Sequence, residues 1–464
     1  MRSARPGLAA LLAALAACGT GLYDAEGIPA VDGALVCLPG QATCAGSCPS
    51  ESTEQCGDTC SNCFGLVPSP PANGVAACLS GLCGYECNPG YLKCTGGCCT
   101  TTALTAGPAF TCALLNDGTI RCWGANGSGQ LGDGSTLDRH APVAVALPPA
   151  AVASSLSAGT AHACAVMGGG AVSCWGANDQ GQSTGAFSSG PVYPPAATPV
   201  TSGATAVAAG AAHTCALLSS GAVTCWGSNA LGQLGPGPGA PIASGANALT
   251  AGASHTCALL GGAVTCWGDN ASGQLGDGTT APRAGTFTPI PSGIAWVAAA
   301  AGQTCAARAL ATNNPIDDVV RCWGDSLGGA FGFAAPQTLP AIPMKSVDQS
   351  TIRGDDVTIL TVGRRHGCYQ KRTESVSCFG AESARGQLGG APVAVSELVQ
   401  VPLVPVTVPA VRALAAGADH GCAALGDGRL RCWGANERGQ LGNADPAPIP
   451  NDPGVGVIVV PSGR

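Results

Sequence analysis

The sequence predicts an all-β protein, a seven-bladed β-propeller preceded by a small disulfide-rich segment. Three observations support this fold class. A hairpin with a cysteine on each arm, first seen at Cys112–Cys122, occurs seven times along the chain. The seven copies share the 364 residues from 101 to 464, about 52 residues each, which suits the four short strands of a blade. Glycine supplies 70 of the 464 residues and aromatic residues only 4%, a composition that favours short strands and tight turns.

Residues 1–18 have the pattern of an export signal. Arg2 and Arg5 give a positively charged start, and the apolar stretch Leu8–Ala17 is too short to span a bilayer. The stretch ends in Leu-Ala-Ala before Cys18, which resembles the lipobox of bacterial lipoproteins, where the cysteine is acylated and becomes the new N-terminus. The resemblance implies lipidation at Cys18. An ordinary cleaved signal with an incidental cysteine is the alternative.

The signal implies a place in the bacterial cell envelope. Gly19, and not an acidic residue, follows the cysteine and does not favour retention in an inner membrane, so we expect the outer membrane, on its periplasmic or cell-surface side. Residues 19–36 then form a short tether. The net charge of −7 and the presence of only three lysines argue against a nucleic-acid partner. Arg364 and Arg365 are interpreted as solvated strand positions and not as a phosphate site.

Residues 37–100 form a cysteine-dense segment that cannot bury enough apolar surface to fold without covalent links. Six disulfides would supply them, with a connectivity that the sequence does not determine. Part of the segment, Cys83–Cys94, vaguely resembles small extracellular modules of the EGF type. Cys60-x-x-Cys63 could suggest zinc or redox chemistry, but no helix pattern or histidine partner follows it. The twelve cysteines are Cys37, Cys44, Cys48, Cys56, Cys60, Cys63, Cys78, Cys83, Cys87, Cys94, Cys98 and Cys99.

The turn of the fourth hairpin predicts that its cysteines are joined. Gly261-Gly262 suits a two-residue primed turn, because both positions tolerate positive φ. Counting back from the turn puts Cys257 and Cys266 at a non-hydrogen-bonded pair, which lies within disulfide reach. Five other copies have a spacing of ten, which suits a three-residue loop with a bulge, and one has seventeen. The predicted pairs are Cys112–Cys122, Cys164–Cys174, Cys215–Cys225, Cys257–Cys266, Cys305–Cys322, Cys368–Cys378 and Cys422–Cys432.

Histidine stands two residues before the first cysteine in five of the copies. Cysteine and histidine can ligate zinc, but Phe110 and Gln303 replace the histidine in the other two copies. We therefore expect no metal and interpret the histidines as structural residues that cap or pack at the start of a strand. One lipidated cysteine, twelve in the segment and fourteen in hairpins account for all 27, as expected outside the cytoplasm. The histidines are His162, His213, His255, His366 and His420.

Each copy continues after its hairpin with Trp-Gly (Phe379-Gly380 in the sixth), a polar turn and Gly-Gln-Leu-Gly, as in Gly129–Gly132. The whole pattern, Gly-x-x-His-x-Cys-Ala-Leu…Trp-Gly-x-Asn-x-x-Gly-Gln-Leu-Gly, resembles the RCC1 (regulator of chromosome condensation) repeat. The resemblance implies a closed seven-bladed propeller in which the Trp-Gly and the glycines are scaffold. Copy two departs at Gln182–Thr184, and copy five departs at Ala300 and Gly329–Phe331.

The resemblance does not carry over the activity of the family's best-known member, a nuclear nucleotide-exchange factor for a small GTPase. Fold does not determine function, and an exported protein does not meet such a partner. Similar bacterial propellers are secreted binders, including an inhibitor of β-lactamases. We therefore expect a binding scaffold at the cell envelope whose partner is a protein. A glycan-binding or glycan-cleaving propeller and a structural envelope or matrix component are the alternatives.

We expect no enzymatic activity and no cofactor. The sequence has no His-Glu-x-x-His and no phosphate loop with lysine. Asp133 and Asp277, each after a Gly-Gln-Leu-Gly, could hold calcium, but solvated turn residues are the simpler interpretation. His140 is the one histidine outside the repeat position. Loop residues that break the repeat are the candidates for a partner site, because symmetry-related residues are usually scaffold. These candidates are Asn313, Asp317, Phe331, Arg353, Asp355 and Asp356.

Overall fold

The computed structural model describes most of the repeat array and part of the segment before it. Among the residues that it describes, there is one 3-10 turn, η3 (Gly168–Gly170), and every other element is a β-strand. None of those residues forms a helix with the length and apolar character needed to cross a membrane. The described residues are 35–36, 71–79, 82–95, 97–236, 244–290, 292–308, 320–325, 344–345, 357–371, 376–380, 385–388, 411–444 and 457–458.

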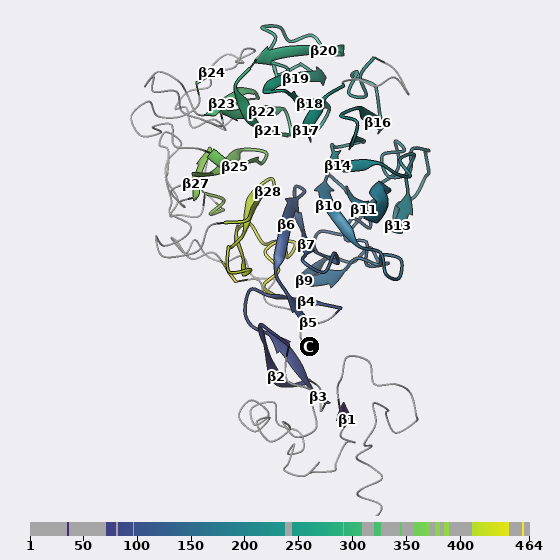
Figure 1. The fold of residues 1–464 in the computed structure, drawn as a ribbon, viewed down its shortest axis with the longest axis vertical. Coiled ribbons are helices and arrows are strands. Elements are labelled where there is room, and N and C mark those ends of the chain that lie inside the picture. Colours follow the sequence, from purple (N-terminus) through teal and green to yellow (C-terminus); the bar gives the residue numbers. More distant parts are fainter. Residues whose placement is uncertain are drawn as a thin grey trace, which may run out of the picture. The chain divides into compact units, whose positions relative to one another are not determined.

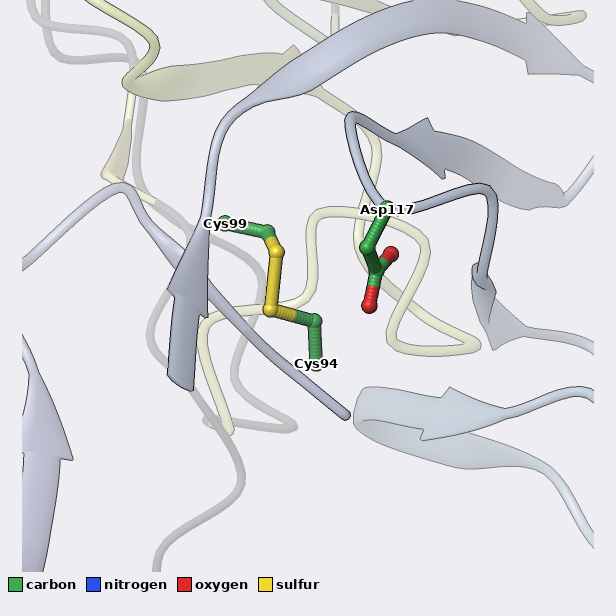
Figure 2. A group of neighbouring side chains, drawn as sticks. All are labelled: Cys94, Cys99 and Asp117. Atoms are coloured by element: carbon green, nitrogen blue, oxygen red, sulfur yellow. A yellow bond between two sulfur atoms is a disulfide. The ribbon is translucent and has the colours of Figure 1, made fainter. Parts of the chain in front are cut away.

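The chain divides into two compact units, and the first comprises residues 1–99 with 461–464. Its described part holds a three-stranded sheet and a two-stranded sheet. Disulfides join Cys87 to Cys98 and Cys94 to Cys99, the latter shown in Figure 2. The sulfur atoms of Cys94 and Cys99 are therefore not available as metal ligands. The strands are β1 (Leu35–Val36), β2 (Gly74–Leu79), β3 (Leu82–Cys87), β4 (Leu92–Cys94) and β5 (Gly97–Cys99).

The second unit, Thr100–Val460, consists of seven antiparallel sheets, or blades, whose strands are paired in sequence order. The all-β prediction is confirmed. From blade 1 to blade 7 the strands are β6 (Thr101–Ala106), β7 (Phe110–Leu115), β8 (Ile120–Gly124) and β9 (Arg139–Ala144); β10 (Ala153–Ala158), β11 (His162–Met167), β12 (Val172–Gly176) and β13 (Val192–Ala197); β14 (Ala204–Ala209), β15 (His213–Leu218) and β16 (Val223–Gly227); β17 (Ala246–Ala251), β18 (His255–Leu260), β19 (Ala263–Gly268) and β20 (Arg283–Ile290); β21 (Ile294–Ala300), β22 (Gln303–Arg308), β23 (Val320–Gly324) and β24 (Met344–Lys345); β25 (Val357–Val362), β26 (His366–Lys371) and β27 (Val376–Gly380); β28 (Ala413–Ala416), β29 (His420–Ala424), β30 (Leu430–Gly434) and β31 (Val457–Ile458).

The blades form a closed ring (Figure 1). The first strand of each blade contacts the first strand of the next, and β28 of blade 7 contacts β6 of blade 1. Each blade comes from one continuous stretch of chain. Closure therefore depends on contacts between blades 7 and 1 and not on a strand that the two ends share.

The hairpin geometry follows from the turns. Gly261 and Gly262 have φ values of 57° and 88°, and Cys257 stands opposite Cys266. In the hairpins of spacing ten, the third loop residue is a glycine with positive φ in four cases, as at Gly118. The structure joins the two cysteines of every hairpin, and the Cα–Cα distance is 4.0–4.1 Å for spacings of nine, ten and seventeen alike.

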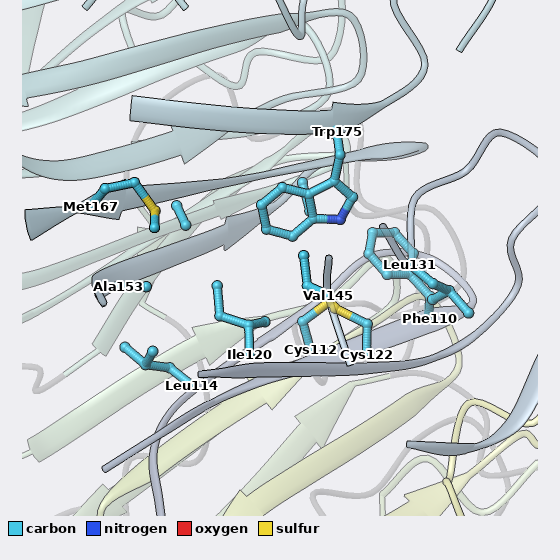
Figure 3. Packing of buried hydrophobic residues seen from close by; sticks show 12 residues of the cluster. Phe110, Cys112, Leu114, Ile120, Cys122, Leu131, Val145, Ala153, Met167 and Trp175 are labelled. Atoms are coloured by element: carbon cyan, nitrogen blue, oxygen red, sulfur yellow. A yellow bond between two sulfur atoms is a disulfide. The ribbon is translucent and has the colours of Figure 1, made fainter. Parts of the chain in front are cut away.

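Apolar clusters between neighbouring blades form the core. In the cluster between blades 1 and 2, the indole of Trp175 lies above Val145 and the Cys112–Cys122 disulfide, with Phe110 and Leu131 beside it (Figure 3). Trp175 is fully buried. The aromatic ring after each second cysteine therefore serves the seam between two blades, as a scaffold residue would.

We expect the fourteen hairpin cysteines to give no free thiol when the protein is denatured without reductant. In the native ring they should also resist added dithiothreitol, because thirteen of them are at most 1% exposed. Cys225 is the partly exposed exception, so Cys215–Cys225 should be reduced first. Alkylation followed by peptide mass mapping measures both results. Labelling of several hairpin cysteines in the unreduced protein would contradict the pairing.

Candidate functional site

Neighbouring blades are joined by a repeated hydrogen bond from tryptophan. The indole N–H donates to the main-chain carbonyl of the glutamine in the preceding blade's polar loop, at 2.8–3.0 Å. A buried indole needs such a partner. Blade 6 has Phe379 in this place and so has no indole N–H to donate. The pairs are Trp123–Gln440, Trp175–Gln130, Trp226–Gln182, Trp267–Gln233, Trp323–Gln274 and Trp433–Gln387.

The repeat histidines also join blades, through a threonine of the following blade. His213 Nε2 lies 2.9 Å from Thr256 Oγ1, which donates its proton to the Gln233 carbonyl at 3.2 Å. Because the hydroxyl proton is already used, His213 must donate through Nε2–H and keep Nδ1 unprotonated. The sequence predicts capping or packing for the histidines, and the threonines are partners that only the structure reveals. The other pairs are His162–Thr214, His255–Thr304 and His420–Thr111.

The contact with the following blade explains most of the differences between blades at the position of the repeat histidine. Phe110 is followed in blade 2 by Ala163, and the two residues share one apolar cluster. Gln303 donates from its side-chain amide to the main-chain carbonyl of Arg364 in blade 6. His366 is the exception, because its ring has no side-chain hydrogen bond to the following blade in the described structure, although backbone groups of Ala418 and His420 lie close to it. The residue that would face it in blade 7 is a glycine and has no hydroxyl.

Burial lowers the pKa of all five repeat histidines. The pKa falls to about 3 for His162, His213 and His420, and to about 4 for His255 and His366. The rings are fully buried, and removal of water disfavours the charged form. Their Nδ1 atoms accept no hydrogen bond in the described structure. The histidines are therefore neutral parts of the seams at neutral pH.

The glycine three residues before the histidine makes room for the ring. A Cβ atom on Gly210 would lie 2.2 Å from His213 Cε1 and 2.8 Å from the carbonyl oxygen of Gly252 in the next blade. Both distances are too short for a side chain. Blade 5 has Ala300 at this position together with Gln303, so the two departures from the repeat occur together.

The polar loop after Trp-Gly is held by its own side chains. Asn126 Oδ1 accepts from the Leu131 N–H, and Gln130 Oε1 accepts from the Ser128 N–H. Asp133 accepts at Oδ1 from Asn126, and its Oδ2 pairs with Arg139 at 2.8 Å. Burial alone would raise the pKa of Asp133, but hydrogen bonds from Ser135 and Arg139 outweigh it and hold the pKa below the ordinary value. The loop is thus a rigid scaffold whose carboxylate is surrounded by donors.

We expect calcium to leave the melting temperature of the ring unchanged. Asp277 is arranged like Asp133: Asn270 and Thr279 donate to Oδ1, and Arg283 lies 2.8 Å from Oδ2. A cation would have to displace these donors. Differential scanning fluorimetry with millimolar calcium and with chelator measures the effect, and D277N is the matched variant. A calcium-dependent rise that D277N abolishes would show that the acids bind calcium.

A cavity of about 500 Å³ lies between the seven inner strands; we call it the channel. Its wall is formed by the inner strand of each blade and the first residues of the loop that follows, as in Thr361–Arg364 of blade 6. Alanine, glycine and residues with hydroxyl groups dominate the wall. Arg364 lies in the loop between β25 and β26 and not on a strand, which corrects the interpretation from the sequence.

The other candidate residues are placed only in part. His140 lies on β9, where its Cα would stand 2.5 Å from a Cβ atom on Gly439 of blade 7, so it belongs to the closing seam. The letters Gly-x-Ser-x-Gly occur twice, at Gly181–Gly185 and at Gly324–Gly328. In the first, the Ser183 hydroxyl is buried and donates to the Ala177 carbonyl. In the second, the preceding strand β23 belongs to an antiparallel sheet, unlike the strand of a nucleophile elbow. Outside the described residues lie Cys18, Asn313, Asp317, Phe331, Arg353, Asp355 and Asp356.

Comparison with known families identifies the repeat. The "Regulator of chromosome condensation (RCC1) repeat" matches residues 102–130, 153–182, 204–233 and 411–440, and a second model of the same description matches residues 117–166. The matches fall in blades 1, 2, 3 and 7. The matched stretches include the polar loop of blade 1 and the His162–Thr214 seam, whereas the loops and seams of blades 4, 5 and 6 lie outside them.

Solved structures of two similar proteins show the same fold. Human WBSCR16 is 21% identical, with a TM-score of 0.59 over 74% of this chain and 94% of that chain. Prp20p from Saccharomyces cerevisiae, described with its binding to Gsp1p and histones, is 18% identical, with a TM-score of 0.54 over 73% of this chain and 83% of that chain. Yeast RCC1 (Prp20) bound to Kap60 is also 18% identical, with a TM-score of 0.53 over 73% and 81%.

Proposed function

Because this chain carries RCC1 repeats in a closed propeller, we propose that it is an exported, lipid-anchored binding scaffold of the bacterial cell envelope whose partner is a protein. The fold supports a binding role in general terms, since such propellers typically act as interaction scaffolds without catalysis. The envelope location rests on residues 1–18 and the lipobox-like cysteine Cys18. The protein partner is favoured by the yeast propeller, which binds Gsp1p and histones.

The observation that carries the proposal is the use of the repeated polar residues. Apart from His366, the tryptophan, histidine, threonine and glutamine of the repeat are engaged in blade-to-blade hydrogen bonds, as in His213–Thr256 and Trp267–Gln233. The asparagine is engaged in its own loop, as at Asn126. Recognition therefore falls to residues that differ between blades, which the rigid ring presents on its loops.

A pull-down from envelope extract tests this function. The bait is the mature chain with C18S, so that it stays unacylated, and a reduced and alkylated sample, in which the ring is unfolded, is the control. We expect a protein that is enriched on the folded bait alone. A glycan array run in parallel distinguishes the alternatives: binding to glycans without an enriched protein would favour the glycan-binding propeller, and neither result would favour a structural component.

The anchor has its own test. Cells that make the full chain should incorporate labelled palmitate into it, and globomycin should block its processing. C18S should lose the label while the ring stays folded. Normal export and processing of C18S would instead indicate an ordinary cleaved signal.

A further inference from the structure

One charged side chain stands at the channel. Arg364 is the only charged residue among the described residues of the wall, and it is exposed. No described carboxylate lies within ion-pair distance of its guanidinium. The channel therefore has a positive charge at one end that no wall residue neutralises.

The backbone of Arg364 is held on two sides. Its N–H donates to the Gly417 carbonyl of blade 7 at 3.3 Å, and its carbonyl accepts from the Gln303 side chain of blade 5. Gln303 stands at the position where most blades have the repeat histidine. This departure from the repeat in blade 5 therefore fixes the loop of blade 6 that carries Arg364. A side chain on a fixed backbone loses less freedom on binding than one on a mobile loop.

The wall adds hydrogen-bond donors to this charge. The hydroxyls of Thr105, Ser157 and Thr250 each accept the N–H of an alanine on the next inner strand, at 2.8–3.0 Å, and each still has a proton to donate. Blades 3, 5 and 7 have alanine in place of the threonine or serine, as at Ala208. The inner strand that follows each of these blades therefore has no side-chain hydroxyl to accept its N–H. Donors with a guanidinium and no carboxylate form a surface that suits an anion.

Acids on the neighbouring loops are already paired. Asp419, in the blade 7 loop beside Arg364, lies 3.2 Å from Arg385, which also lies 3.5 Å from Glu437. Asp138 of blade 1 lies 3.0 Å from Arg438. Neither acid forms an ion pair with Arg364 in the part of the chain that the structure describes.

We propose that Arg364 and the adjoining channel wall bind a carboxylate on an acidic segment of the partner protein. The inference rests on the proposed function and adds the chemistry of the partner. Arginine binds carboxylates in two-pronged, charge-assisted contacts. The segment enters the channel end-on or by a side chain, because the small wall residues leave the cavity open.

The test uses the mature full chain with C18S and a fluorescein-labelled oligoglutamate peptide as probe. We expect saturable binding by fluorescence anisotropy that weakens with salt, and R364Q should bind roughly tenfold more weakly. R412Q is the matched control, because Arg412 is also exposed on blade 7 but does not line the channel. R364Q should keep the wild-type melting temperature, since the Arg364 side chain makes no bond in the described structure.

Four outcomes would overturn the inference. Equal affinity of R364Q and the parent would remove Arg364 from the site, and equal weakening by R412Q would reduce the effect to net charge. Displacement of the peptide by citrate at the same carboxylate concentration would assign the site to a free small acid. In the envelope pull-down, a partner that R364Q still binds fully would contradict this inference but not the proposed function. The absence of any partner would contradict the proposed function.

Discussion

Lowering the pH from 7 to 5 is expected to destabilise the propeller by about 2 kcal/mol for each of its five buried histidines, or about 10 kcal/mol in all. Their pKa is about 3 to 4 in the folded ring and ordinarily 6.5. The folded ring keeps them neutral, whereas the unfolded chain takes up protons below pH 6.5. The stability is thus fully present above pH 6.5 and is lost as the pH falls towards the folded pKa values.

Neighbouring charges modify this effect without reversing it. Asp179 opposes the lowered pKa of His162, and Asp419 opposes that of His366. The nearby His255 lowers the pKa of His213 further. The carboxylates with lowered pKa lose their contribution only below about pH 4, so the range from pH 7 to 5 isolates the histidines.

Denaturant midpoints followed by tryptophan fluorescence at several pH values measure this loss. H366Q is the matched variant, because His366 lacks the threonine partner of the other histidines and glutamine is the natural residue at this position in blade 5. The loss between pH 7 and 5 should shrink by about 2 kcal/mol in H366Q. An unchanged midpoint across this range in the parent protein would refute the neutral, buried state of the five rings.

The second large effect is expected from G210A, which should destabilise the ring by about 3 kcal/mol. The new Cβ atom would stand 2.2 Å from the ring of His213, inside a packed seam. In blade 5, by contrast, Ala300 and Gln303 occur together. We therefore expect H213Q to rescue part of the loss, so that the double variant is more stable than the sum of the single effects by about 1 kcal/mol or more.

G190A is the control for this cycle. Nothing lies within 4 Å of a Cβ atom on Gly190, and we expect a change of less than about 0.5 kcal/mol. Chemical unfolding of the four variants measures the cycle. Simple additivity of G210A and H213Q would mean that the clash lies with the Gly252 carbonyl and not with the histidine ring.

The sequence predicts the parts of this fold that depend on local chemistry. The Gly261-Gly262 turn determines the register of its hairpin, and with the register comes the pairing of Cys257 with Cys266. The seven copies of the repeat predict a closed ring of seven blades. These features need only residues that are close in the chain, or a repeat that can be counted.

The seams were harder to predict, because their partners are far apart in the chain. His213 and Thr256 are separated by 43 residues, and Thr111 and His420 by 309. One signal was present: a histidine in one copy is mostly followed by a threonine in the next. Arg364 was missed because its role depends on a loop that blades 5 and 7 hold in place.

The paired departures distinguish the blades that carry them from the others. Similar units in one chain risk assembling out of order during folding. Ala163 has no hydroxyl and suits only a predecessor like Phe110, while Thr214 suits one like His162. At such seams a wrong neighbour would leave a buried polar group unsatisfied, so the departures favour one order of the blades that carry them.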